Sequence, residues 1–217
     1  MKLEPMAEFF DSRLMEYEAH QLQEIAHADE FYPYTAGLLP DVPGCAVLDL
    51  GCGTGLELGF YFQKNPAACV TGIDLAPGML GVLKKKFPDK RLQLVNGSYF
   101  TVPFAEGSYD AAVSVESLHH FSLKQKIPLY RKLHKALKPG GYFILTDYFA
   151  QDDRQERENF EQLAQLEKGL GPCGEGGYHF DTPLTREHEI QALLAGGFSQ
   201  VERMKAWGQT QVFKAFW

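Results

Sequence analysis

Three glycines at alternate positions follow a short apolar run that contains one acid. The segment reads Val47-Leu-Asp-Leu-Gly-Cys-Gly-Thr-Gly55. A buried strand that runs into such a turn ends at the carboxyl edge of a parallel sheet, where ligands bind. Glycine allows the backbone to approach a ligand closely and adopts positive φ without steric cost. The pattern therefore predicts a ligand-binding turn at Gly51, Gly53 and Gly55.

A second acid, Asp74, ends the next predicted strand, 74 − 55 = 19 residues after the last of these glycines. An ionised carboxylate has two oxygens and can accept hydrogen bonds from the two neighbouring hydroxyls of a ribose. Together, the glycine turn and Asp74 predict a ligand that contains a nucleoside.

The spacing of these residues excludes two common nucleotide sites. The third glycine of a dinucleotide fingerprint would fall on Leu56, and no Gly-Lys-Ser/Thr of a phosphate-binding loop is present. Asp49 precedes the turn, where it would repel a pyrophosphate and attract an α-ammonium group. A ligand with adenosine at one end and an amino acid at the other fits the glycine turn, Asp74 and Asp49.

Short β-branched runs alternate with longer helical patterns, which is typical of a parallel sheet with crossover helices. Strands are expected at 46–50, 69–74, 92–95, 111–115 and 142–146, helices at 56–64, 77–87 and 123–138, and a C-terminal hairpin at 200–204 and 210–216. The prediction is an α/β fold with a doubly wound, seven-stranded sheet, mostly parallel, with one antiparallel strand from the hairpin.

Two segments do not fit the alternation of strands and helices. Residues 1–40 have apolar side chains at helical spacing and are expected to form an N-terminal helical cap on a main domain at 41–217. Residues 150–184 form an insertion that begins as a polar helix and continues into a glycine-rich stretch, which is expected to be mobile.

Composition narrows the class of protein further. The 217 residues are 45% apolar with a net charge of −7, and four cysteines lack CxxC spacing. No apolar run is long enough for a membrane helix, and the acidic opening does not resemble a signal peptide. We expect a cytoplasmic protein that binds neither a metal nor, given its acidity, nucleic acid. The sequence leaves its oligomeric state open.

The motifs resemble those of the class I (Rossmann-like) S-adenosylmethionine-dependent methyltransferases over about residues 42–217. Val47–Gly55 is similar to that family's first motif, and Asp74 to its ribose-binding acid. Further similar segments follow in order: Val102-Pro103-Phe104, Tyr109–Ser114 with Leu118-His119-His120-Phe121, and Leu137–Gly141.

The resemblance implies S-adenosylmethionine as cofactor. Asp49 would contact its amine, Asp74 its ribose, and Leu75 and Met79 its adenine. The family usually has an acid after the third strand, where this chain has Gly97, Ser98 and Tyr99. The expected cofactor-binding residues are Tyr17, Asp49, Gly51, Cys52, Gly53, Gly55, Asp74, Leu75, Met79, Gly97, Ser98, Tyr99 and Glu116.

The implied reaction is an in-line transfer of methyl from a sulfonium, so the protein chiefly positions the reactants and excludes water. His119 and His120 are the candidate catalytic residues, because the loop after the fourth strand faces the methyl group in this family. Adjacent side chains cannot point the same way, so at most one of the two is expected to reach the site. The alternative is that these histidines only fix the loop.

We expect a methyltransferase that acts on a small-molecule acceptor, with the insertion at 150–184 lining the acceptor pocket. One alternative is an enzyme of tRNA modification, which would need a basic surface patch. A second is a non-catalytic module that binds S-adenosylmethionine. A nicotinamide-dependent dehydrogenase ranks last, because of the glycine spacing.

Overall fold

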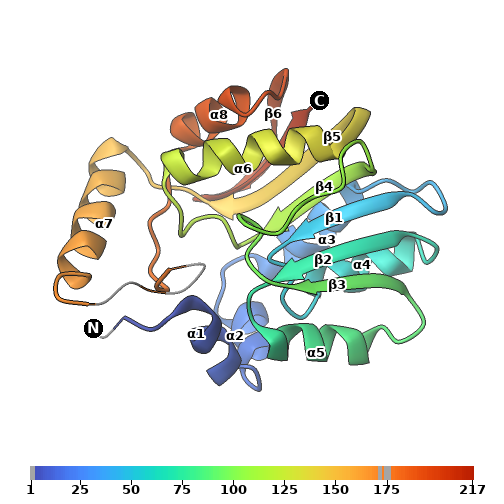
Figure 1. The fold of residues 1–217 in the computed structure, drawn as a ribbon, viewed down its shortest axis with the longest axis horizontal. Helices are drawn as coiled ribbons and strands as arrows, with labels where there is room; N and C mark the ends of the chain where they lie inside the picture. Colours follow the sequence, from blue (N-terminus) through green and yellow to red (C-terminus); the bar gives the residue numbers. More distant parts are fainter. Residues whose placement is uncertain (1–2, 171–172, 174–176) are drawn as a thin grey trace.

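The structure is a computed structural model that describes residues 3–170, 173 and 177–217. Its strands are β1 (Ala46–Leu50), β2 (Cys69–Asp74), β3 (Arg91–Asn96), β4 (Tyr109–Val115), β5 (Leu137–Tyr148), β6 (Gln200–Trp207) and β7 (Thr210–Phe216). They form one seven-stranded sheet in the order β3-β2-β1-β4-β5-β7-β6 (Figure 1). β7 runs antiparallel to both of its neighbours, β5 and β6, so the predicted doubly wound sheet with an antiparallel hairpin strand is confirmed.

The helices alternate with the strands over the middle of the chain. They are α1 (Met6–Ser12), α2 (Tyr17–Gln23), α3 (Ala28–Leu38), α4 (Leu56–Lys64), α5 (Pro77–Lys86), α6 (Leu123–Ala136), α7 (Asp153–Leu166) and α8 (Arg186–Ala195). The element that departs most from the expected bounds is β5, predicted at 142–146. It is longer because it pairs with β4 from Leu137 and with β7 as far as Tyr148.

The sheet reverses its direction of winding between β1 and β4. The chain proceeds from β1 outward to β2 and β3, then returns to place β4 on the other side of β1. At such a switch point the loops that follow the two central strands separate and leave a crevice at the carboxyl edge. The glycine turn after β1 and the His119–His120 loop after β4 both lie at this edge.

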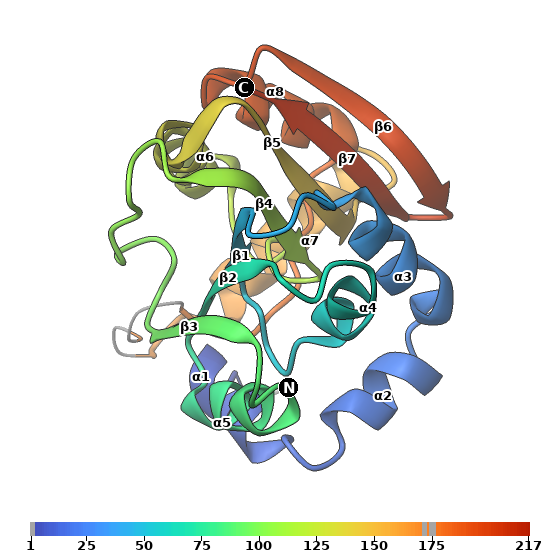
Figure 2. The same ribbon diagram turned by 90° about the vertical axis from the view of Figure 1, so that its right-hand side faces the viewer.

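Two apolar layers cover the two faces of the sheet. Residues of α6 and α8 join one buried cluster, with Tyr130 and Leu193 fully buried. Residues of α3 and α4 join the other, with Phe31 and Leu58 fully buried. Figure 2 shows α6 and α8 on one side of the sheet and α3 and α4 on the other. Burial on both faces fixes the strands, and with them the loops at the edge.

The first two helices lie at the carboxyl edge, beside the helix that follows β2 (Figure 1). Here α1 packs against α5, and the Gly78 N–H donates to Asp11 Oδ1 at 2.9 Å. Glu18 on α2 pairs with Lys86 on α5 at 2.6 Å. The N-terminal segment is therefore attached to the edge that carries the predicted ligand turn.

The insertion returns to this same edge after α7. Asp152 caps α7 by accepting a hydrogen bond from the Gln155 N–H at 2.8 Å. Farther on, the His179 N–H donates to the Glu4 carbonyl and the Met6 N–H to the Gly177 carbonyl, at 2.9 and 3.0 Å. Most of the glycine-rich stretch predicted to be mobile lies outside the described residues. Within the described ranges, no helix is long and apolar enough to span a membrane.

Candidate active site

The turn after β1 needs glycine at each of its three alternate positions. Gly51, Gly53 and Gly55 have φ of 73°, 49° and 72°, in the left-handed region that other residues rarely adopt. A Cβ at position 51 would stand 2.0 Å from Ser117 Oγ, and one at 55 would stand 2.4 Å from Leu83. The turn is thus packed tightly against the loop that follows β4.

Asp74, at the end of β2, is hydrogen-bonded to two segments of this edge. Its Oδ2 accepts from the Gly53 N–H and its Oδ1 from the Ala76 N–H, each at 2.8 Å. Burial raises the pKa of Asp74, and these hydrogen bonds act in the opposite direction. Each oxygen retains a lone pair that can accept from a ligand hydroxyl.

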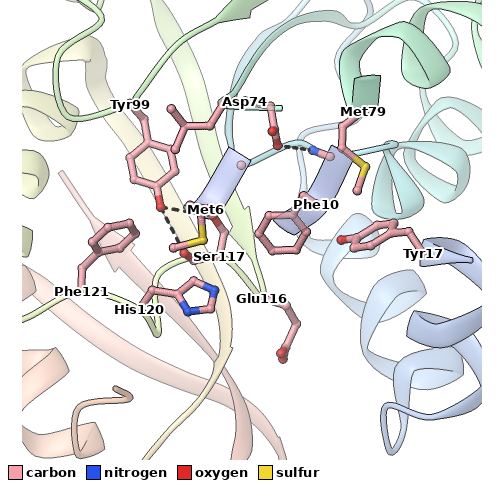
Figure 3. Close-up of a pocket in the computed structure, with 13 residues that line it drawn as sticks. Met6, Phe10, Tyr17, Asp74, Met79, Tyr99, Glu116, Ser117, His120 and Phe121 are labelled. Carbon is pink, nitrogen blue, oxygen red and sulfur yellow. Dashed lines mark hydrogen bonds between the residues drawn. The ribbon is translucent and has the colours of Figure 1, made fainter. Parts of the chain in front are cut away.

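A first cavity, the edge cavity, lies between the glycine turn and α1 (Figure 3). Its lining is Met6, Phe10, Tyr17, Gly51, Gly53, Asp74, Leu75, Met79, Tyr99, Glu116, Ser117, His120 and Phe121. Met6 and Phe10 from α1 and Tyr17 from α2 line one side of it, and its volume is about 50 Å³. Because a small-molecule site typically measures about 300–1,000 Å³, Met6, Phe10 and Tyr17 must move to admit a nucleoside.

A second and larger cavity, the side cavity, adjoins the first and has a volume of about 410 Å³. Its lining is Phe9, Phe10, Arg13, Glu16, Tyr17, His20, Gln21, Ile25, Glu116, His119, His120, Tyr148, His179 and Asp181. The two cavities share Phe10, Tyr17, Glu116 and His120. The two cavities therefore meet at these four residues, which molecules in either cavity would contact.

His119 is buried against a carboxylate from β5. Its Nδ1 lies 2.6 Å from Asp147 Oδ1, while Asp147 Oδ2 accepts from the Leu118 N–H at 2.9 Å. Burial alone would lower the pKa of His119, but the charge of Asp147 and its hydrogen bond raise it to about 9. His119 is thus an imidazolium at neutral pH, ion-paired with Asp147.

His120 has the opposite protonation. Burial and the neighbouring charge of His119 lower the pKa of His120, so its ring is neutral. Its Nδ1 lies 3.2 Å from both the Phe180 carbonyl oxygen and Asp181 Oδ1. Both neighbours are hydrogen-bond acceptors, which places the proton on Nδ1 and leaves Nε2 with a lone pair.

Glu116 follows the last residue of β4 and has a strained backbone conformation. Its φ of 49° is unusual for a residue with a side chain, and its N–H donates to the Thr146 carbonyl at 2.8 Å. Burial and the charge of Asp147 raise the pKa of Glu116 to about 8. Its buried Oε1 has no hydrogen-bond partner among the described residues. This uncharged carboxyl group thus lies at the junction of the two cavities.

Two groups of three side chains bring metal-ligating atoms within 4.8 Å of one another. They are His119, His120 and Asp181, and Glu116, His119 and Asp147. The Nδ1 atoms of both histidines already have hydrogen-bond partners. These contacts account for the arrangement without an ion, and the expectation of no metal stays a prediction.

The predicted site residues divide into two sets. Those that line a cavity are Tyr17, Gly51, Gly53, Asp74, Leu75, Met79, Tyr99, Glu116, His119 and His120. Those that line neither are Asp49, Cys52, Gly55, Gly97 and Ser98. The Ser98 hydroxyl accepts from the Phe100 N–H at 3.2 Å and so serves the turn after β3.

Sequence reasoning did not select Asp147, Tyr148 or Ser117. Asp147 lies near the carboxyl end of β5, one strand away from the histidines, and that position is the one signal that could have identified it. Asp181, in the insertion that was expected to line the acceptor pocket, lines the side cavity while its side chain is 51% exposed.

Comparison with known proteins agrees with this fold and with a methyltransferase domain. Residues 47–141 match a family model described as a methyltransferase domain. A sterol 24-C-methyltransferase from Gibberella zeae is 26% identical over 172 residues, covering 71% of this chain and 44% of the relative. A tRNA (carboxymethyluridine(34)-5-O)-methyltransferase from Arabidopsis thaliana is 29% identical over 167 residues, and the match covers 75% of this chain and 38% of the relative.

A putative O-methyltransferase from Nostoc punctiforme has the same fold, with a TM-score of 0.72 at 23% identity. The alignment covers 100% of this chain and 63% of that one. The chain thus spans less than two thirds of each of these three proteins.

The charge of His119 should depend on Asp147. In Asp147→Asn we expect the pKa of His119 to fall from about 9 to its ordinary value near 6.5 or below, because burial then opposes the charge. An imidazole NMR titration measures this shift. The raised pKa also stabilises the fold below pH 6.5, and this contribution disappears as the pH rises through 9; the variant should lack it.

His188 provides an internal control in the same spectra, because its raised pKa depends on Glu156 and not on Asp147. An unchanged titration of His119 in Asp147→Asn would contradict the ion pair.

Proposed function

Because residues 47–141 match a family model described as a methyltransferase domain, we propose that this protein uses S-adenosylmethionine to transfer a methyl group to a small-molecule acceptor. The observation that carries the proposal is the junction of the two cavities at Phe10, Tyr17, Glu116 and His120. A cofactor in the edge cavity would adjoin a space of about 410 Å³, within the size range of small-molecule sites.

The edge cavity has the groups that an adenosyl amino acid requires. Asp74 offers a carboxylate to the ribose hydroxyls, and Leu75 and Met79 offer apolar surface to the adenine. The glycine turn lines the cavity with Gly51 and Gly53, whose backbone has no side chain to exclude a ligand. We propose these residues, together with Asp49 near the amine and Glu116 near the methionine end, as the cofactor site.

The N-terminal helices would act as a lid over this site. Met6 and Phe10 from α1 and Tyr17 from α2 occupy the edge cavity, so cofactor entry needs them to shift. Phe9 stacks on His179 with ring centroids 3.5 Å apart, which couples α1 to the end of the insertion. We propose that residues 1–40 close over the cofactor and that the insertion at 150–184 encloses the acceptor.

His120 is the candidate proton acceptor. When bound, S-adenosylmethionine supplies a methyl group that its sulfonium has already activated. His120 contacts both cavities in its neutral form, and the Phe180 carbonyl and Asp181 hold the Nδ1 proton, so Nε2 can accept a proton from a hydroxyl or amine. The His119–Asp147 ion pair keeps His120 neutral and fixes the loop, which makes His119 a positioning residue.

Nucleic acid is the second candidate acceptor, because a tRNA methyltransferase is among the relatives. The net charge of −7 opposes it, since tRNA binding requires clustered basic side chains. A third candidate is a module that binds the cofactor without catalysis. Assays with small acceptors and with bulk tRNA distinguish the three.

Asp74→Ala should weaken the binding of S-adenosylhomocysteine at least about tenfold, or about 1.4 kcal/mol, because the variant lacks the carboxylate for the ribose. Titration calorimetry measures this change. Asp89→Ala, at an exposed turn before β3, is the control and should bind as wild type. Equal affinity in Asp74→Ala and wild type would contradict the ribose assignment.

Transfer of labelled methyl from S-adenosylmethionine to a panel of amines, phenols, carboxylic acids and thiols tests the function itself. We expect turnover with at least one small acceptor and none with tRNA. In His120→Ala, kcat should fall about 10²-fold but stay measurable, since proton acceptors typically contribute about 10²–10⁴ and positioning remains. Wild-type kcat should decline at a pH below 6.5, as His120 becomes protonated.

His27→Ala, at an exposed position before α3, serves as the matched histidine control. A wild-type kcat and pH profile in His120→Ala would exclude His120 as the proton acceptor. Methylation of tRNA alone would exclude a small-molecule acceptor.

A further inference from the structure

Glu116 is the acid at the junction of the two cavities. It is one of the four residues that line both of them, and its side chain lies between those of His120 and Tyr17 (Figure 3). Its Oε1 is buried and has no hydrogen-bond partner in the part of the chain that the structure describes. Native proteins rarely leave a buried polar atom unsatisfied unless it has a function. A ligand at the junction would supply the missing partner.

A strained backbone holds Glu116 at this position. Its φ of 49° lies in the left-handed region, which a residue with a side chain rarely adopts. The hydrogen bond from its N–H to the Thr146 carbonyl, at 2.8 Å, fixes this conformation. Strained residues of this kind cluster at functional sites. The backbone and the unpartnered oxygen thus both indicate a function for this side chain.

The cations near Glu116 are already paired with other acids. The titratable groups that act on its carboxyl are Asp147 and Tyr148 on β5, His119 in its own loop, Asp181 in the insertion, Tyr17 on α2 and Tyr32 on α3. His119 is the cation among them, and it is paired with Asp147. Arg13, which lines the side cavity, is paired with Glu4. Burial and the charge of Asp147 therefore dominate, and they raise the pKa of Glu116 to about 8.

We propose that Glu116 distinguishes the sulfonium form of the cofactor from the thioether product: it is protonated in the free protein, loses its proton when S-adenosylmethionine binds, and regains one when the methyl group is transferred. The proposal rests on the proposed function, which places the methyl group at the junction of the two cavities. The proton lost on binding goes to solvent. Transfer to a hydroxyl acceptor then breaks an S–C bond, forms a C–O bond and frees one proton, which balances the one that Glu116 regains.

The charge of the ligand is sufficient to change the protonation of Glu116 at neutral pH. A positive charge within about 4–6 Å lowers the pKa of a carboxyl group by about 1–3 pH units. Since the pKa of Glu116 is about 8 in the free protein, a sulfonium at the junction would bring it to neutrality or below. The resulting carboxylate attracts a sulfonium but not an uncharged thioether. The site should therefore prefer the substrate form of the cofactor, which favours release of the product.

Two ligands that differ only at the sulfur provide the test. S-adenosylmethionine and S-adenosylhomocysteine have the same nucleoside and amino acid, so a contact of Glu116 with either of those parts would affect both ligands equally. Titration calorimetry of both at pH 7, in two buffers of different ionisation enthalpy, measures the affinity and the number of protons released. For the wild type we expect S-adenosylmethionine to release close to one proton more than S-adenosylhomocysteine.

Glu116→Gln replaces the protonated carboxyl group with a neutral group of the same shape that cannot ionise. This variant should raise the Kd for S-adenosylmethionine about tenfold, leave the Kd for S-adenosylhomocysteine unchanged and abolish the additional proton release. Glu161→Gln, at an exposed position on α7, is the matched control and should behave as wild type.

Equal proton release with the two ligands in the wild type would overturn the proposal, and this measurement needs no variant. An unchanged ratio of the two affinities in Glu116→Gln would overturn it as well. If the wild type bound neither ligand, the proposed function itself would fail.

Discussion

The carboxylate of Asp74 is the contact on which the architecture of the site depends. β1 and β2 are adjacent and parallel, so the glycine turn and Asp74 emerge at the same edge. Hydrogen bonds of 2.8 Å from Gly53 and Ala76 then fix the turn and the start of α5 relative to each other. The bridge acts together with backbone hydrogen bonds from the Gly51 and Cys52 N–H groups to the Ile73 carbonyl, at 2.8 and 3.2 Å, to hold a turn with three alternate left-handed glycines. The crevice is therefore preorganised before any ligand binds.

On the other side of the crevice, the pairing of β4 with β5 fixes the position of the loop after β4. It brings His119 from the loop after β4 to Asp147 on β5, and the resulting ion pair holds the loop in place. Burial, together with the positive charge of His119, then lowers the pKa of His120 and keeps its ring neutral. Two neighbouring histidines thus have different protonation states. The difference arises because the pairing of β4 with β5 brings Asp147 to His119 and not to His120.

The local patterns of the sequence predict the strands, the glycine turn and Asp74, because each depends on residues close together in the chain. The partners of the histidines could not be predicted in this way. Asp147 lies 28 residues from His119, and Phe180 lies 60 residues from His120, so tertiary packing alone brings them together.

The central claim is that the crevice between the glycine turn and Asp74 leads directly into the cavity beside His120. A crystal structure with S-adenosylhomocysteine tests this claim most directly. The account predicts ribose hydroxyls on Asp74, displaced side chains of Met6, Phe10 and Tyr17, and a sulfur that faces the side cavity. A ligand bound elsewhere, or a sulfur that faces away from His120, would contradict it.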